Sequence, residues 1–168
     1  AARAALQGAL LDLDARRAGR TLSAHLAASA GSTCGEPLSR VPVNALLTAR
    51  DAGALFREAV FAREAGYRAV KIKLGSDAVT SDVARLRAVR EGIGPSIRLR
   101  GDANGAWPVR AALAALEAFA PFDLEYVEQP VAAQDLDGMA ELHRRAAVPV
   151  AADESVASES GMLRLLAA

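Results

Sequence analysis

Charged residues end four successive hydrophobic runs in this sequence. Lys71 and Lys73 belong to the first run, and the later runs end at Asp102, Glu128 and Asp153. From one run to the next these positions lie roughly 25 to 31 residues apart, close to the roughly 30 residues of one strand–helix repeat. The carboxyl ends of parallel barrel strands open on one face, so the spacing predicts one active site built from four consecutive βα units.

The residue types indicate a metal-assisted proton transfer. Two carboxylates about 4 Å apart repel each other by about 4 kcal/mol at an effective dielectric of about 20, so three of them require a cation. Oxygen ligands from Asp102, Glu128 and Asp153, with no cysteine or well-placed histidine among them, suit Mg²⁺, with Mn²⁺ as a second candidate. Lys71 and Lys73 would lie near each other and near this dication. Both effects favour the neutral amine, which makes a lysine here a candidate base.

The chain alternates between strand-like and helix-like segments. A first helix is predicted at 1–17, followed by a Gly-, Ser- and Thr-rich connection, loop or loosely helical, at 18–40. We then expect strands at 41–47, 69–74, 97–102, 124–129 and 148–153, and helices at 51–65, 78–91, 107–119 and 134–146. Strict βαβα order predicts a parallel sheet with helices outside. The fold class is therefore α/β, a partial TIM-type (β/α) barrel of about five βα units over residues 41–168.

Alternation along each strand decides which side chains share a face. Ile72 and Leu74 are expected to point to the helices, whereas Gly101 should weaken its strand because a packing side chain is missing there. The side chains expected on the inner face are Lys71, Lys73, Arg100, Asp102, Tyr126 and Glu128, with Asn104 if its strand persists that far. Trp107 and Pro108 are expected to begin the following helix.

The composition excludes several classes of protein. The 168 residues are 52% hydrophobic and 24% charged with a formal net charge of zero, as in ordinary globular proteins. Lys and Arg are spread along the helices and aromatic residues make up only 4%, which argues against a nucleic-acid partner. The sequence shows no apolar stretch long enough for a membrane span and no leader pattern at its start, so the expected location is the cytoplasm. The single Cys34 is interpreted as a loop thiol.

Four motifs carry a family resemblance. In order and spacing they resemble the enolase superfamily, in its muconate-lactonizing subgroup: Lys71-Ile72-Lys73, Asp102-Ala103-Asn104-Gly105, Glu128-Gln129-Pro130 and Asp153-Glu154-Ser155. Together with Val41-Pro42-Val43-Asn44, the motifs are most similar to the o-succinylbenzoate synthases of actinobacteria. The resemblance covers nearly the whole chain, and it is more specific for the superfamily than for the reaction.

The resemblance implies a role for each site residue. Asp102, Glu128 and Asp153 match ligands of Mg²⁺, which would bind the carboxylate of a small-molecule substrate and stabilise the enediolate. Lys73 matches the general base, and Lys71 would tune the pKa of Lys73 and help to hold the substrate. Two polar positions, Arg100 and Asn104, match supporting residues. The implied reaction removes water from a cyclohexadiene carboxylate to give o-succinylbenzoate for menaquinone biosynthesis.

Other interpretations of these residues and of the chain stay open. Each acid could be an ordinary strand end or helix cap, Arg100 could form only a structural ion pair, and Asn104 could only shape a turn. The same site would also suit an N-acylamino acid racemase, a dipeptide epimerase or a cycloisomerase.

The ends of the chain predict a fragment. The sequence begins at Ala1 without a methionine and stops within a helical pattern at Met162–Leu166. Under the resemblance, residues 1–17 are the last helix of an N-terminal capping domain, and a further lysine is expected on a sixth strand beyond Ala168. On this hypothesis the isolated chain is an inactive truncated product that tends to aggregate, and its oligomeric state stays open.

Overall fold

The protein is described by a computed structural model that covers residues 2–31, 38 and 40–167. Two compact units are present, Ala1–Pro42 and Val43–Ala168. The first unit contains α1 (Ala2–Arg17) and α2 (Leu22–Ser29). The Oγ1 atom of Thr21 accepts a hydrogen bond of 3.2 Å from the backbone N–H of Ala24, which caps α2. The predicted connection at 18–40 thus includes a regular helix, and Cys34 lies outside the described residues.

Helix α1 covers the helix predicted at 1–17 and leaves its apolar side exposed. Its leucines Leu6, Leu10 and Leu13 are 63%, 52% and 42% exposed, and the buried residue of this helix is Ala15. The packing of α1 within its own unit therefore leaves these leucines largely uncovered. Its place at the end of a capping domain stays a prediction.

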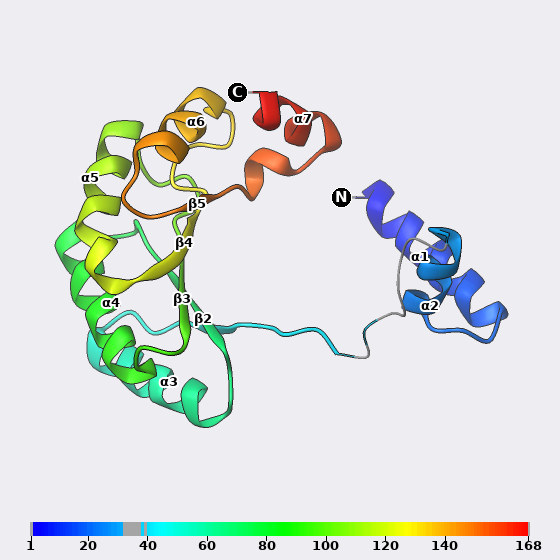
Figure 1. Ribbon diagram of the computed structural model, residues 1–168, viewed down its shortest axis with the longest axis horizontal. Coiled ribbons are helices and arrows are strands. Elements are labelled where there is room, and N and C mark those ends of the chain that lie inside the picture. The colour runs from blue at the N-terminus through cyan, green and yellow to red at the C-terminus, as the bar shows by residue number, and fades with distance from the viewer. Residues whose placement is uncertain (1, 32–37, 39, 168) are drawn as a thin grey trace. The chain divides into compact units, whose positions relative to one another are not determined.

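The second unit is built on a parallel sheet of five strands in the order β1-β2-β3-β4-β5. The strands are β1 (Ala45–Leu47), β2 (Ala69–Lys73), β3 (Arg98–Asp102), β4 (Leu124–Glu128) and β5 (Val150–Ala151). The connecting helices are α3 (Ala52–Glu64), α4 (Val79–Ile93), α5 (Val109–Phe119) and α6 (Leu136–Arg145), and α7 (Glu159–Ala167) follows β5. Figure 1 shows α3 to α6 side by side along one face of the sheet. The predicted α/β class and the parallel order are confirmed.

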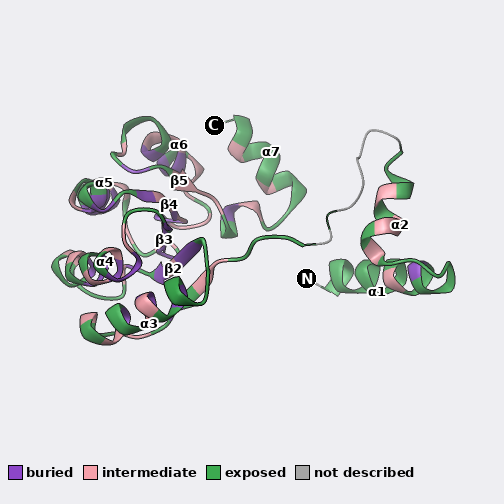
Figure 2. Ribbon diagram, turned by 60° about the horizontal axis from the view of Figure 1, so that its bottom comes forward, coloured by how far each residue is buried: buried purple, intermediate pink, exposed green. Residues whose placement is uncertain are grey.

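The hydrophobic core lies between the sheet and these helices. Ile72 and Leu99 are fully buried and pack in one cluster with Leu86 and Leu116 from the helices. In Figure 2 the buried stretches follow the strands and the helix sides that face them. Each Leu or Ile side chain removed from water contributes about 1.5–3 kcal/mol to folding, so this layer holds the strands in place.

Gly101 has a packing role that its sequence pattern did not indicate. A Cβ atom at Gly101 would lie 2.5 Å from Cδ1 of Leu74 and 3.2 Å from Cγ2 of Val127. The absence of a side chain lets these two core residues meet over β3. The expectation that Gly101 weakens the strand is therefore incomplete, because the glycine makes room for the packing of its neighbours.

Several element boundaries differ from the predicted ones. Strand β1 begins at Ala45 rather than residue 41, and Val43 is 69% exposed. Strand β5 consists only of Val150–Ala151, so it ends before Asp153. Each of these strands pairs with one neighbour within the described sheet, and fewer ladder hydrogen bonds define their ends. Helix α5 begins after Pro108, which adopts an extended N-cap conformation instead of the first helical position.

A bulge in β4 changes which residues reach the inner face. Leu99 is paired with Leu124 and Arg100 with Tyr126, so Glu125 is an extra residue on β4. As a result, the neighbours Glu125 and Tyr126 both approach Arg100. The predicted inward position of Tyr126 agrees with this contact, whereas Glu125 was not predicted to be there.

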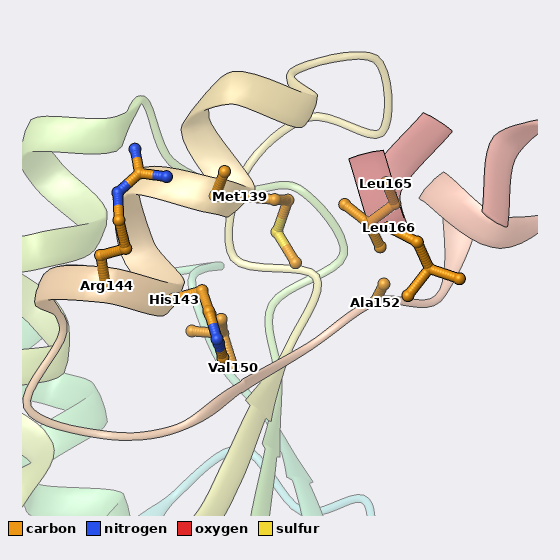
Figure 3. A pocket seen from close by; sticks show the side chains of 8 residues that line it. Met139, His143, Arg144, Val150, Ala152, Leu165 and Leu166 are labelled. Atoms are coloured by element: carbon orange, nitrogen blue, oxygen red, sulfur yellow. The ribbon is translucent and has the colours of Figure 1, made fainter. Parts of the chain in front are cut away.

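One cavity of the second unit lies between α6, β5 and α7, and its volume is about 390 Å³. Met139, His143, Val150 and Leu165 are among the residues that line it (Figure 3). The residues that border it include none of the lysines and acids predicted to do chemistry. In the described part of the chain, no helix combines the length and the apolar character that crossing a membrane requires.

Candidate active site at the carboxyl ends of the strands

Lys71 joins two of the predicted metal ligands. Its Nζ atom lies 2.9 Å from Oδ2 of Asp102 and 2.8 Å from Oε2 of Glu128. The three residues come from β2, β3 and β4. In the register of the sheet, Lys73 is paired with Asp102 and Asp102 with Glu128, so these three strands end at the same edge. The Asp102 side chain is only 4% exposed. Parallel strands are normally apolar on both faces, so this buried charged cluster is a feature with a specific cause.

Lys73 lies at the more open side of the same cluster. Its Nζ atom is 2.7 Å from Oδ2 of Asp102 and donates a hydrogen bond of 2.6 Å to Oδ1 of Asn104. The Lys73 side chain is 51% exposed, which leaves its amine accessible to a substrate. Strand β3 ends at Asp102, and Asn104 has a left-handed backbone with φ of 44°. Asn104 therefore reaches Lys73 from the turn after the strand and not from a continued strand.

The charges in the cluster alter the ionisation of Lys71 and Asp102. Burial disfavours the charged form of both groups, but the hydrogen bonds and charges between them outweigh burial. The pKa of Lys71 is therefore raised, because Glu128 and Asp102 both accept hydrogen bonds from it, and the pKa of Asp102 is lowered by Lys73 and Lys71. The nearest partners of Lys71 are carboxylates, which favour its charged form. The neutral amine expected beside a dication stays a prediction.

Asp153 does not join the other two carboxylates. It follows β5, its side chain is exposed, and its backbone N–H donates a hydrogen bond of 3.0 Å to Oε1 of Gln129. Within residues 2–31, 38 and 40–167, no three His, Cys, Asp or Glu side chains lie close enough together to hold a metal ion. The structure thus brings Asp102 and Glu128 together and places Asp153 at the end of the neighbouring strand. Its role as a ligand stays a prediction.

The neighbouring Glu154 contacts one of the two supporting residues, Asn104. Its Oε1 atom accepts a hydrogen bond of 3.0 Å from Nδ2 of Asn104. Asn104 therefore connects Lys73, at the end of β2, with Glu154, after β5. This places Asn104 in a polar contact with the base candidate, beyond its function in the turn.

Arg100 forms the inner ion pair that was one of its two interpretations. Its Nε atom lies 2.6 Å from Oε2 of Glu125, Nη1 donates to Oδ1 of Asn44 at 3.2 Å, and the guanidinium lies 5.3 Å from the ring centre of Tyr126. Glu125 was not among the predicted site residues. The sequence held no signal for the bulge, because a parallel strand that is buried on both faces does not show by its apolar pattern which residues face inward.

The chemistry of the donors suits a hard cation, although among the described residues no three of them converge on one point. Asp102 and Glu128 already share one positive group, the Lys71 ammonium, at hydrogen-bond distance. Their ligand atoms are carboxylate oxygens, which Mg²⁺ prefers. Asp153 would add a third carboxylate from the adjacent strand end. The assignment of Asp102, Glu128 and Asp153 as metal ligands therefore stays a prediction.

Comparison with known proteins gives a family for this site. A family model described as "Enolase C-terminal domain-like" matches residues 54–168. This range includes both lysines, the three acids and the two supporting residues, Arg100 and Asn104. It covers more than half of the chain.

Individual relatives catalyse different reactions. The chain is 45% identical over 96 residues to an o-succinylbenzoate synthase of Thermobifida fusca, which covers 57% of this chain and 30% of that protein. It is 37% identical over 164 residues to an o-succinylbenzoate synthase of Mycolicibacterium smegmatis, covering 96% of this chain and 49% of the relative. A hydrophobic dipeptide epimerase of Enterococcus faecalis is 39% identical over 101 residues, 60% of this chain and 28% of the epimerase. The chain thus spans less than half the length of each of these relatives.

Solved structures agree with the fold. A mandelate racemase/muconate lactonizing family protein from Azoarcus sp. EbN1 superposes with a TM-score of 0.84 at 33% identity, over 95% of this chain and 40% of that one. The E. faecalis dipeptide epimerase, complexed with Mg and the dipeptide L-Leu-L-Tyr, gives a TM-score of 0.71 at 34% identity over 76% of this chain and 36% of its own. The five βα units are accordingly part of a TIM-type barrel, as predicted. From the matched range and the shared fold, the chain belongs to the enolase C-terminal domain-like family.

Proposed function

We propose that this protein is an o-succinylbenzoate synthase, a metal-dependent lyase of menaquinone biosynthesis. The observation that carries the proposal is its similarity to two such synthases, at 45% and 37% identity, the second over 96% of the chain. The accessible amine of Lys73 beside the buried Asp102 gives this similarity a chemical site.

Lys73 is the base in this proposal. Its amine would take the proton α to the carboxylate of the cyclohexadiene substrate. The hydroxyl group would then leave as water, after receiving that proton back from the Lys73 ammonium. The overall reaction removes one water molecule from the substrate and makes its ring aromatic. Asn104, which accepts a hydrogen bond from Lys73 at 2.6 Å, would orient the amine during both transfers.

Mg²⁺, held by Asp102, Glu128 and Asp153, would supply positive charge next to the substrate carboxylate and so make the α-proton more acidic. Support comes from a structural neighbour that is complexed with Mg and a dipeptide. Lys71 lies between Asp102 and Glu128, and although burial lowers its pKa, the hydrogen bonds to these two carboxylates raise it overall. This suits Lys71 to hold these carboxylates or a substrate carboxylate.

Dipeptide epimerisation is the second candidate. It is favoured by the 39% identity to the hydrophobic dipeptide epimerase and by the 34% identity of the neighbour with a bound dipeptide. Removal of an α-proton by Lys73 would begin both reactions. The second step differs, because an epimerase returns a proton to the same carbon atom and expels no hydroxyl group.

The two candidates are separated by one substrate comparison. Full-length protein with Mg²⁺ would be given the cyclohexadiene carboxylate and, separately, a panel of hydrophobic dipeptides. We expect formation of the aromatic product, followed by ultraviolet absorbance, to exceed dipeptide epimerisation, followed by deuterium incorporation in NMR spectra. Epimerisation without dehydration would replace the synthase proposal by the second candidate, and a Lys73→Ala variant provides the blank for both assays.

A further inference from the structure

Gln129, the residue after Glu128, forms hydrogen bonds with both polar atoms of its side chain. It is 1% exposed. Its Nε2 atom donates hydrogen bonds to the carbonyl oxygen of Val131 at 2.9 Å and to Oγ of Ser155 at 2.8 Å. Its Oε1 atom accepts from the backbone N–H groups of Asp153 at 3.0 Å and Ser155 at 3.1 Å. The amide therefore ties the end of β4 to the segment that carries Asp153.

The backbone of Gln129 makes two more connections between strand ends. Its N–H donates to the carbonyl of Ala151 in β5 at 2.8 Å, and its carbonyl accepts from the N–H of Gly105, after β3, at 2.6 Å. Gln129, which is next to Glu128 in the sequence, thus forms hydrogen bonds both with the turn after Asp102 and with the end of β5. These are the three segments that carry the predicted metal ligands.

The conformation of Gln129 indicates that this arrangement is specific. Its φ of 41° lies in the left-handed region, which is disfavoured for a residue with a Cβ atom. Such a conformation persists where the surrounding hydrogen bonds over-determine it. Asn or Gly would adopt this backbone more easily, but only the longer glutamine side chain spans the distance to Asp153 and Ser155.

We propose that Gln129 is a positioning residue that sets where Asp153 lies relative to Glu128, and thereby the affinity of the site for its metal ion. This inference rests on the proposed metal site. Asp153 is exposed and lies just outside the two-residue strand β5, so the strand itself does not fix it. The hydrogen bond from its N–H to Gln129 fixes the backbone at Asp153 itself. Groups that orient metal ligands through hydrogen bonds commonly change metal affinity when they are altered.

The test compares metal binding in Gln129→Asn and in a matched control. Asparagine tolerates the left-handed backbone, so the variant should fold, but it is one methylene group too short to reach the N–H of Asp153. We expect the affinity of the full-length protein for Mn²⁺, measured by calorimetry without substrate, to fall by about 10- to 100-fold. A Gln129→Met variant, which fills similar space without hydrogen bonds, should show the same loss.

Arg90→Met is the control for general destabilisation. The Arg90 guanidinium donates to the carbonyls of Phe122, Gly94, Ile97 and Asp123, at the other end of the strands. Its replacement should lower the melting temperature and leave Mn²⁺ affinity unchanged. Equal Mn²⁺ affinity in Gln129→Asn and the unaltered protein would overturn the inference, as would an equal loss in Arg90→Met. If the unaltered protein binds no Mn²⁺, the proposed metal site fails, and the inference fails with it.

Discussion

At the scale of residues, the site consists of two lysines and two carboxylates that form ion pairs with one another. Oδ2 of Asp102 lies 2.9 Å from Nζ of Lys71 and 2.7 Å from Nζ of Lys73. Lys71 is enclosed between Asp102 and Glu128, whereas Lys73 is half exposed and has one carboxylate partner. The more exposed lysine can reach a substrate, and the enclosed lysine is better suited to hold charge in place.

The first prediction separates the two lysines. Lys73→Ala should slow exchange of the substrate α-proton with solvent deuterium by about 100- to 10,000-fold, because a positioned general base contributes that much. Lys71→Ala should weaken substrate binding and shift the pH profile while exchange continues. Exchange measured by NMR at saturating substrate would show this split. Equal exchange in Lys73→Ala and the unaltered protein would refute the assignment of the base.

The second prediction concerns the carboxylates as metal ligands. Asp102→Asn and Glu128→Gln should each abolish most activity and weaken Mn²⁺ binding, because an amide carries no negative charge to balance the cation. Asp153→Asn should have the same effect if it is the third ligand. Calorimetry with Mn²⁺ and circular dichroism spectra of each variant would separate lost metal binding from lost folding. Full activity after exhaustive chelation would contradict the metal requirement.

At the scale of elements, a buried ion pair on α4 holds the loop that follows β2. Asp82 on α4 is fully buried, accepts a hydrogen bond of 2.8 Å from the N–H of Gly75, and pairs with Arg85 at 2.8 Å. Gly75 lies two residues after Lys73, and a Cβ atom there would lie 3.2 Å from Cζ2 of Trp107. Helix α4 and the turn before α5 thus restrict the loop after β2 at Gly75.

The third prediction tests the close packing over β3. Gly101→Val should lower the free energy of unfolding by about 1–3 kcal/mol, the usual cost of overpacking, because its side chain would overlap Leu74 and Val127. Measured in a Leu74→Ala background, the same Gly101→Val substitution should cost less, because the smaller side chain at position 74 leaves space for valine. Urea denaturation of the single and double variants measures both effects. Gly8→Ala, at an α1 position with nothing within 4 Å of an added Cβ, serves as the harmless control.

At the scale of the whole molecule, ion pairs on the inner face make stability depend on pH. A hydrogen bond from Arg100, aided by the charges of Arg100 and Arg98, lowers the pKa of Glu125 below its usual 4.5. The folded state then binds fewer protons at this group than the unfolded state, so stability rises with pH. The contribution is complete above pH 4.5 and is lost as the pH falls through the lowered pKa of Glu125.

The fourth prediction follows from this sign. The free energy of unfolding should decrease less steeply below pH 4.5 in Glu125→Gln than in the unaltered protein, since glutamine has no proton to gain. Arg100→Met should flatten the same part of the curve by returning the pKa of Glu125 toward its usual value. Denaturation curves collected across this pH range provide the measurement. Identical slopes in all three proteins would show that the pair does not contribute.

The order of the elements and the residues that end the strands could be predicted from the sequence alone. Alternating apolar periods predicted the parallel α/β arrangement, and the spacing of Lys71, Lys73, Asp102 and Glu128 predicted their meeting, because the repeat length and the period of two fix which side chains share a face. Local patterns sufficed for these features. They are properties of each βα unit and its neighbour.

The features that depend on contacts between neighbouring βα repeats could be seen only in the folded protein. The bulge that brings Glu125 to Arg100, the fit of Leu74 over Gly101, and the hydrogen bonds from Gln129 to the segment of Asp153 join residues that lie 24 to 27 positions apart in sequence. The raised pKa of Lys71 likewise depends on which carboxylates surround it. Distances of a few tenths of an ångström settle such contacts, and no pattern along a single strand encodes them.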